Sequence, residues 1–470
     1  MPWKVAGQGD TRDASRAIAF NPVLKIVLIA AVALGLLIPL TLFENLVGER
    51  AERQRLVEFE IGDLWGQPQT VAGPILLVPA QRELTDEQGR VTMLEEHLLL
   101  LPDSYKVEAV LEPERRNRGP FEAVVYRLAL KLDAVFLLAG SPRESLEGAK
   151  PDWARARLLL GLGDQRSLTE APDISWDGRG LVTEPGLPSV LAHLTTSGLQ
   201  SDLPLGADDF GRPLAFSASL QLNGSSRLSI LPLGRTTSAT VASSWPHPSF
   251  EGGILPIESE VSDEGFSARW SASHFSRSYP QVWRIGGVEE IRLSELAASA
   301  FGVRLHQPVD TYRQSERTTK YGVLFILLTF AFLFLYEVIS GRRLHSLQYG
   351  LVGCALALFY LLLLALAEQM PFALAYAIAA ASIVGQLVFY TAGAFGSLKH
   401  ALGLGLIVTV LYGCLYLLIS LQDLALLVGA IALFAVLLAV MAATRRTDWY
   451  AVMPMMEVEA NVEKEKADPN

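Results

Sequence analysis

The chain has 470 residues, of which 50% are hydrophobic and 19% are charged, and its formal net charge is −10. The hydrophobic fraction is too high for an ordinary soluble chain. The acidic balance argues against binding to nucleic acid or anionic lipid headgroups by charge alone. The 2 cysteines, Cys354 and Cys414, both fall inside apolar stretches, so we expect no disulfide in the soluble part of the chain.

Six apolar stretches are long enough to cross a bilayer, each near the ~20 residues that ~30 Å of hydrocarbon requires. They are residues 23–43, 322–339, 349–366, 371–390, 401–421 and 424–443. A short segment, residues 1–22, precedes the first span, and an acidic tail that we expect to be disordered, residues 444–470, follows the last. The first span lacks a small-residue cleavage site after Phe43, so we interpret it as an uncleaved anchor in which Pro39 permits a kink.

The segment between the first and second spans, residues 44–321, is one large soluble block. Its first part, residues 48–65, mixes charged and apolar residues in a way that predicts a charged helix leaving the membrane. Further along, apolar residues recur at every second position, which is typical of strands with one buried face. Two such runs carry Tyr105, Val107, Ala109 and Leu111 in the first, and Tyr126, Leu128, Leu130 and Leu132 in the second. The predicted fold class is therefore an α+β membrane protein, with six transmembrane helices and a large β-rich domain between the first and the second.

Three local patterns in this block predict particular elements. Asn223-Gly224 between two apolar runs predicts a hairpin with a tight turn, because both residues tolerate positive φ angles. Pro151 and Asp152 before an apolar run predict the start of a helix. Residues 161–211 are rich in Gly, Pro, Ser and Asp, which predicts loops over the sheet.

The charges of the short loops predict the orientation, because Lys and Arg are retained on the cytoplasmic side. The loops at one end of the spans carry basic residues, and the short loops at the other end carry none. The basic residues are Lys4, Arg12, Arg16, Arg342, Arg343, Lys399, Arg445 and Arg446. We therefore expect both termini in the cytoplasm and the large domain outside.

Several motifs along the chain resemble those of one known family. They are Trp245-Pro246-His247-Pro248-Ser249-Phe250 in the soluble block, Arg317-Thr318-Thr319-Lys320-Tyr321 at the return to the membrane, Gln348-Tyr349-Gly350-Leu351-Val352-Gly353, Phe359-Tyr360, Glu368 and Ala375-Tyr376 around the spans, and Thr444-Arg445-Arg446-Thr447-Asp448-Trp449 after the last span. In this order they resemble the CreD family of bacterial inner-membrane proteins, over nearly the whole chain. The family pattern has Ser at positions 365 and 367 and His at 369, where this chain has Ala365, Ala367 and Gln369.

The resemblance implies a cell-envelope integrity protein of the bacterial inner membrane whose large domain lies in the periplasm. It also implies an association with a two-component envelope response and with tolerance of colicins and β-lactams. No chemical activity follows from it, since a phenotype does not identify a site.

A search of the sequence for catalytic and metal-binding patterns is negative. The 7 histidines are scattered without the spacing of metal ligands. The glycine string at residues 393–399 lacks the context of a phosphate loop, and no Gly-x-Ser-x-Gly elbow occurs. We predict that the protein is not an enzyme and holds no metal and no cofactor.

The candidate functional residues in the soluble block are Trp245, His247 and Phe250. Two prolines flank His247 and hold it in an extended conformation. His247 therefore either presents its side chain to a ligand or partner, or belongs to a rigid turn that packs Trp245 and Phe250.

The candidate residues of the spans are polar or aromatic, because such groups are costly or informative in a membrane. Glu337 either pairs with Arg342 or Arg343 at the cytoplasmic end of its span, or contacts a proton or substrate. We interpret Glu368 as a solvated carboxylate at the outer surface. Tyr360 and Tyr376 either line a shared groove or serve bundle packing. Tyr321 and Gln348 are candidates because they belong to the motifs that resemble the CreD family.

Three classes of function remain open on these residues. A non-enzymatic envelope protein whose β domain binds a periplasmic partner or a lipid fits best. A transporter, or an insertase with the layout of YidC-type proteins, is the alternative; those insertases carry a positive charge within the bilayer, whereas the second to sixth spans contain no Lys or Arg. An envelope enzyme is the third class and lacks a catalytic set. The oligomeric state stays open.

Overall fold

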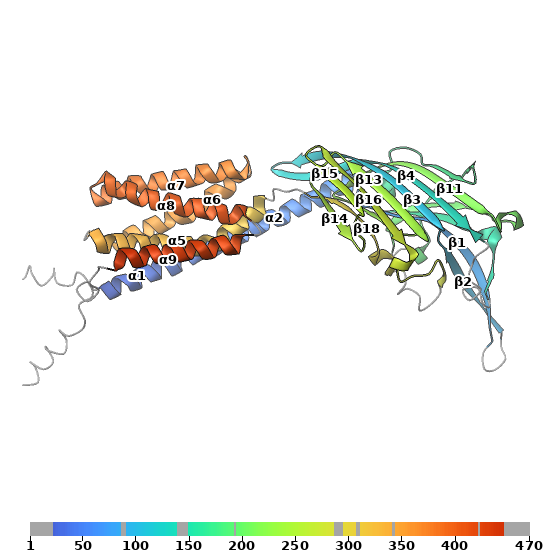
Figure 1. The fold of residues 1–470 in the computed structure, drawn as a ribbon, viewed down its shortest axis with the longest axis horizontal. Helices are drawn as coiled ribbons and strands as arrows, with labels where there is room; N and C mark the ends of the chain where they lie inside the picture. Colours follow the sequence, from blue (N-terminus) through green and yellow to red (C-terminus); the bar gives the residue numbers. More distant parts are fainter. Residues whose placement is uncertain are drawn as a thin grey trace, which may run out of the picture. The chain divides into compact units, whose positions relative to one another are not determined.

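The computed structural model describes residues 22–85, 91–138, 149–191, 194–285, 295–306, 311–340, 344–421 and 424–445. The chain divides into two compact units. The helical unit comprises Met1–Glu52 and Asp310–Asn470, and the β unit comprises Arg53–Val309. Figure 1 shows the long helices of the first unit and the layered strands of the second.

Long helices make up the helical unit. They are α1 (Pro22–Gly35), α2 (Leu37–Trp65), α5 (Thr311–Ser340), α6 (Ser346–Ala367), α7 (Phe372–Phe395), α8 (Leu398–Ser420) and α9 (Ala425–Thr444). Within the described residues, 6 helical segments are long and apolar enough to cross a membrane, and α1 with α2 forms the first of them. The predicted α+β class, with six apolar helices and a large β-rich domain, is confirmed.

The first membrane segment is interrupted at Leu36, between α1 and α2. Pro39 has no N–H to donate to the carbonyl of Gly35, and its ring crowds that carbonyl. The interruption stays short, because Leu36 N still donates to Val32 O at 3.0 Å and Leu40 N to Leu36 O at 3.3 Å. Since α2 then continues to Trp65, the predicted charged helix is a continuation of the first span.

The helices of this unit pack around α6 and α8. Helix α6 contacts α1, α5 and α7, and helix α8 contacts α5, α7 and α9. Small residues allow the close approach: a side chain at Gly353 of α6 would collide with Leu36 and Phe330, and Ala375 and Ala379 of α7 are fully buried. Helix α9 buries no part of its apolar window within the unit, which fits a helix in contact with lipid.

Two sheets make up the β unit (Figure 1). The 10-stranded sheet follows the order β14 (Pro248–Gly252), β18 (Phe301–Leu305), β12 (Arg227–Ile230), β1 (Gln69–Thr85), β6 (Arg157–Leu162), β10 (Ser197–Asp202) and β9 (Glu184–Pro185). Two further strands, β2 (Val91–Leu100) and β5 (Ala149–Pro151), also pair with β1. Strand β17 (Val282–Ile285) in turn pairs with β2. The 8-stranded sheet follows the order β15 (Glu258–Ser262), β16 (Gly265–Ser273), β13 (Thr236–Ser243), β3 (Ser104–Arg118), β4 (Phe121–Leu137), β11 (Pro213–Ser225), β7 (Asp173–Trp176) and β8 (Arg179–Gly180). Short 3-10 turns lie between strands at η2 (Trp153–Arg155), η3 (Gln165–Ser167), η4 (Ser189–Leu191), η5 (Ala207–Asp209) and η6 (His274–Ser276).

Both sheets contribute to one hydrophobic core. Strands β3 and β4 confirm the predicted alternation, since the eight apolar residues of the two runs are all at most 2% exposed. Aromatic contacts cross between the sheets: Trp270 of β16 stacks on Phe301 of β18, with ring centroids 5.7 Å apart. The end of α2 joins the same unit, because Trp65 Nε1 donates to the carbonyl of Tyr126 at 3.3 Å.

The predicted hairpin at Asn223-Gly224 is wrong. Both residues lie inside β11, where Gly224 is directly opposite Tyr126 of β4. A side chain at Gly224 would collide with the Tyr126 ring, so glycine here makes room for an aromatic neighbour and does not form a turn. The chain leaves the sheet at Ser226, which has a φ of 53°, and enters the other sheet as β12.

The helix predicted to begin at Pro151 is also wrong. It is reduced to the single turn η2, and the apolar run after it forms β6 between β1 and β10. Residues 158–162 are all buried, and a short, continuously apolar run suits a strand covered on both faces. Residues 161–211, predicted to form loops, also contribute the short strands β7, β8, β9 and β10.

Candidate functional site

A buried polar cluster joins three helices at one end of the helical unit. Lys25 of α1 forms an ion pair with Glu337 of α5, and Lys25 Nζ also donates to the carbonyl of Leu344 at 2.7 Å. The Tyr349 hydroxyl of α6 donates to Glu337 Oε2 at 2.9 Å, and Leu344 N donates to Glu337 Oε1 at 3.2 Å. Lys25, Glu337 and Tyr349 are 8%, 5% and 1% exposed. We call these three residues the Lys25 cluster.

Both charges of the Lys25 cluster are compensated inside an apolar environment. A lone charge in a membrane helix is costly, whereas a paired and hydrogen-bonded one is tolerated. The sequence predicts Arg342 or Arg343 as the partner of Glu337, and both lie outside the described residues. The ion-pair partner that the structure gives is Lys25 of α1. Its position inside the predicted first span was the available signal.

A second polar contact lies at the opposite end of α6. Glu368 caps this helix, and its Oε1 accepts a hydrogen bond from the Tyr312 hydroxyl of α5 at 3.4 Å. Arg50 Nε of α2 lies 3.7 Å from the same oxygen. The Glu368 side chain is 16% exposed, so it is more enclosed than the solvated carboxylate that the sequence predicts. It ties three helices together.

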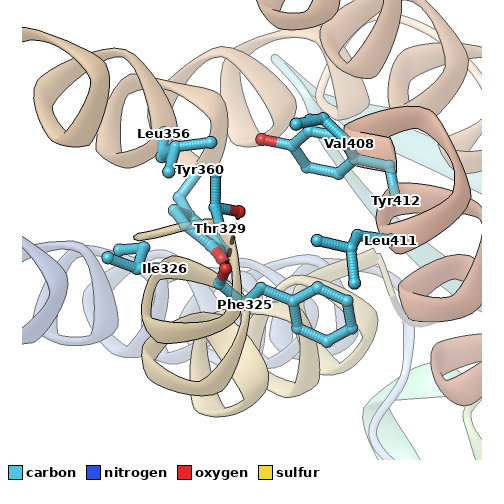
Figure 2. Close-up of a pocket in the computed structure, with 8 residues that line it drawn as sticks. All are labelled: Phe325, Ile326, Thr329, Leu356, Tyr360, Val408, Leu411 and Tyr412. Carbon is cyan, nitrogen blue, oxygen red and sulfur yellow. Dashed lines mark hydrogen bonds between the residues drawn. The ribbon is translucent and has the colours of Figure 1, made fainter. Parts of the chain in front are cut away.

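Tyrosines occupy the centre of the helical unit. Tyr360 of α6 and Tyr412 of α8 line a small pocket whose other walls are mostly apolar (Figure 2). Gly322 of α5 leaves room for Tyr360, because a Cβ there would lie 2.7 Å from the Tyr360 hydroxyl oxygen. The neighbouring Tyr376 of α7 donates its hydroxyl hydrogen to the carbonyl of Tyr412 at 2.7 Å. In this region, aromatic packing and one hydrogen bond connect α6, α7 and α8.

The two other candidates of the helical unit, Gln348 and Tyr321, lie apart from these contacts. Gln348 forms a capping box at the start of α6, where its Oε1 accepts from His345 N at 2.8 Å. It also lies at the edge of an open, apolar groove lined by α7 residues such as Val388 and Phe389. Tyr321 is partly buried and packs against the helical core.

The Trp245 to Phe250 segment leads from β13 into β14. The Trp245 ring is buried, its Nε1 donates to the carbonyl of His306 at 2.9 Å, and the Arg115 guanidinium lies 5.1 Å from its centroid. The carbonyl of His247 accepts from His306 N at 3.0 Å, while its side chain is exposed. Phe250 packs edge-to-face on Trp270 at 5.6 Å. The Trp245 and Phe250 side chains thus pack within the β unit, whereas the His247 side chain does not.

The candidate residues therefore fall into separate places, and the structure does not assemble them into one site. Glu337, Glu368, Tyr360 and Tyr376 each connect helices of the helical unit. Trp245, His247 and Phe250 belong to the β unit. Among the residues that the structure describes, no group of three or more His, Cys, Asp or Glu side chains could hold a metal ion.

Together, the apolar helices and the β unit define a multi-pass membrane protein with a large β-rich soluble domain. The family described as "Inner membrane protein CreD" matches residues 21–450. The chain belongs to this family. A curated relative, the inner membrane protein CreD of Escherichia coli strain K12, is 32% identical over 439 residues, which cover 91% of this chain and 94% of the relative.

Two solved structures resemble the chain distantly. A candidate nutrient-binding protein of Legionella pneumophila is 10% identical, with a TM-score of 0.23 over 46% of this chain and 74% of that one. An M1 zinc metallopeptidase of Deinococcus radiodurans is 10% identical, with a TM-score of 0.17 over 37% of this chain and 38% of that one. Scores this low support no argument about function.

Proposed function

We propose that the protein is a non-enzymatic envelope-integrity protein whose β unit binds an envelope partner or lipid in the periplasm. The observation that carries this proposal is how the helical unit uses its polar groups. Glu337, Glu368 and Tyr376 each bind a group on another helix of the same unit. Such contacts hold a bundle together, so the helices act as an anchor and the binding function falls to the β unit.

The proposed orientation rests on the Lys25 cluster together with the loop charges. The cluster joins the start of α1, the end of α5 and the start of α6, so these ends lie on one side of the helical unit. The loops on this side carry Arg342 and Arg343, and basic loops stay in the cytoplasm. The opposite ends, including Glu368, then face the periplasm, as does the β unit that follows α2.

A transporter or insertase is the second candidate. The observation that favours it is the buried charge of Lys25, since an ionisable residue inside a membrane protein is by default a functional candidate. Against it, Glu337 neutralises Lys25, and the Leu344 main chain and Tyr349 occupy further bonding positions of the pair. A charge that is already paired and enclosed is less able to receive a substrate.

The function can be tested by replacing residues 66–306 with a flexible linker in a strain that lacks its own family member. We expect this chain to reach the membrane but to lose the tolerance of detergent and β-lactam that the full chain restores. Membrane levels are compared by blot. Full tolerance without the β unit would overturn the proposal.

The same assay separates anchoring from transport at the polar residues. The double variant Lys25→Met/Glu337→Met keeps side chains of similar length without a buried charge, so an anchor should retain tolerance. Glu368→Gln and His247→Gln should also be mild. Loss of tolerance in Glu368→Gln or in the double variant, at a normal membrane level, would favour transport.

A further inference from the structure

Strand β15 lies at an edge of the 8-stranded sheet (Figure 1). It pairs with β16 on one side, and no strand in the described residues pairs with its other side. An edge strand presents unpaired N–H and C=O groups, which makes it a template for another strand.

The inner face of this edge carries Ser259 and an exposed apolar residue, Val261. Val261 is directly opposite Phe266 in the register, and opposite residues project from the same face of a sheet. Phe266 is buried in the core, yet Val261 on the same face is 53% exposed. Leu255 and Ile257, just before the strand, are 67% and 55% exposed.

Val261 is exposed because the 10-stranded sheet ends before it reaches β15. Strand β14 is the last strand of the 10-stranded sheet, and its Phe250 packs on Phe266 and Trp270 of β16, with centroid distances of 6.0 and 5.6 Å. The core is thus closed beneath β16. Strand β15 continues the other sheet by one strand further, so its Val261 stays exposed.

The other face of the edge is acidic. Glu258 is paired with Arg269, but Glu260 and the turn residues Asp263 and Glu264 are exposed without such a pair in the described residues. Pairing with β15 of a second copy would bring these carboxylates together, and like charges across strands are destabilising. The charge therefore favours a basic partner over a second copy of this chain.

We propose that β15 binds an extended segment of a partner protein in which apolar residues alternate with Lys or Arg. The segment adds a ninth strand to the sheet, and main-chain hydrogen bonds supply affinity. Its apolar residues cover Val261, and its basic residues face Glu260, because successive side chains of a strand point to opposite faces. This inference deepens the proposed function and rests on it, since it names the kind of partner that the β unit binds.

Fluorescence anisotropy with a labelled, alternating Lys-Val peptide and the full chain in detergent tests the proposal. We expect saturable binding to the unmodified chain and little binding of an alternating Glu-Val peptide. Glu260→Lys should weaken binding of the Lys-Val peptide about tenfold and improve binding of the Glu-Val peptide. Val261→Asp should weaken binding of the Lys-Val peptide by a similar factor.

Glu170→Lys is the matched control, because it makes the same charge change at an exposed position before β7. Equal weakening by Glu170→Lys and Glu260→Lys would mean nonspecific charge attraction and would overturn the proposal. A change of oligomeric state in Glu260→Lys without a change in peptide binding would identify a second copy as the occupant and would also overturn it. Normal peptide binding by Glu260→Lys and Val261→Asp would overturn the proposed site at β15. If the chain without the β unit also fails to restore tolerance, the proposed function itself still holds.

Discussion

Two fully buried tyrosines of the β unit differ in what their hydroxyl groups meet. The Tyr126 hydroxyl donates to the carbonyl of Arg227 at 2.7 Å, whereas the Tyr105 hydroxyl has no hydrogen-bond partner among the described residues. An unpaired buried hydroxyl costs free energy, and a paired one does not. We therefore expect Tyr105→Phe to raise the free energy of unfolding by about 1 kcal/mol and Tyr126→Phe to lower it by about 1 kcal/mol.

Thermal or urea unfolding of the full chain in detergent, followed by near-ultraviolet circular dichroism, measures this pair of variants. The two substitutions remove the same atom from equally buried rings, so each serves as the control for the other. Equal losses in both variants would contradict the assignment of Tyr105 as unpaired.

The same tyrosines make the stability of the β unit depend on pH in alkaline solution. Burial raises the pKa of both hydroxyls above their ordinary value of 10.0. The folded state thus keeps its phenol protons when the unfolded chain begins to lose them, so the stabilisation is fully present below pH 10 and is lost as the pH rises above it. Unfolding midpoints measured between about pH 8 and pH 11 should fall, and less steeply in the double variant Tyr105→Phe/Tyr126→Phe.

Single residues also show where prediction from sequence ends. That a charge at position 25 inside an apolar span needs a partner follows from solvation alone. The sequence does not show which carboxylate is that partner, because Glu337 is 312 positions away along the chain and reaches Lys25 only through helix packing. For Glu368 the sequence correctly predicts a position at the end of a span, but its contacts with Tyr312 and Arg50 come from two other helices.

At the scale of elements, strands with one buried face could be predicted from the sequence. The position of Gly224 inside a strand and the strand formed by a fully buried run could not. The period of two in β3 and β4 arises from one buried face, so it is visible in the sequence. Gly224 looks like a turn residue, but its role depends on the Tyr126 ring of the neighbouring strand. The run that became β6 is buried on both faces, and such a run has no period that separates strand from helix.

The role of Gly224 predicts the effect of adding a side chain to β11. A Cβ at this position meets the Tyr126 ring, so Gly224→Ala should overpack the core and lower the free energy of unfolding by about 1 to 3 kcal/mol. Gly180→Ala in β8 is the control, because nothing lies within 4 Å of a Cβ there. Unfolding of both variants in detergent measures the difference, and an unchanged midpoint for Gly224→Ala would show that the ring can move away freely.

At the scale of the whole molecule, the two units make separate predictions about topology and folding. The topology follows from the loop charges and from the ends of helices that the Lys25 cluster joins. Cysteines placed at Ser271 of β16 and at Ser420 of α8 should react with a membrane-impermeant reagent in intact cells, and one at Ser346 of α6 should not. The background chain lacks Cys354 and Cys414. Labelling at Ser346 would reverse the proposed orientation.

The last prediction concerns the independence of the β unit. Residues 53–309 contain both sheets and one hydrophobic core to which both contribute, and they form their own compact unit. They contain no cysteine, so their stability needs no disulfide, and a chain of this length can bury an adequate core without one. Expressed alone in reducing buffer, this segment should give a β-dominated circular dichroism spectrum and a cooperative thermal transition. A helix-dominated spectrum, or a melt without cooperativity, would mean that the sheets depend on the helical unit, and the β unit could then not act as a self-contained binding module.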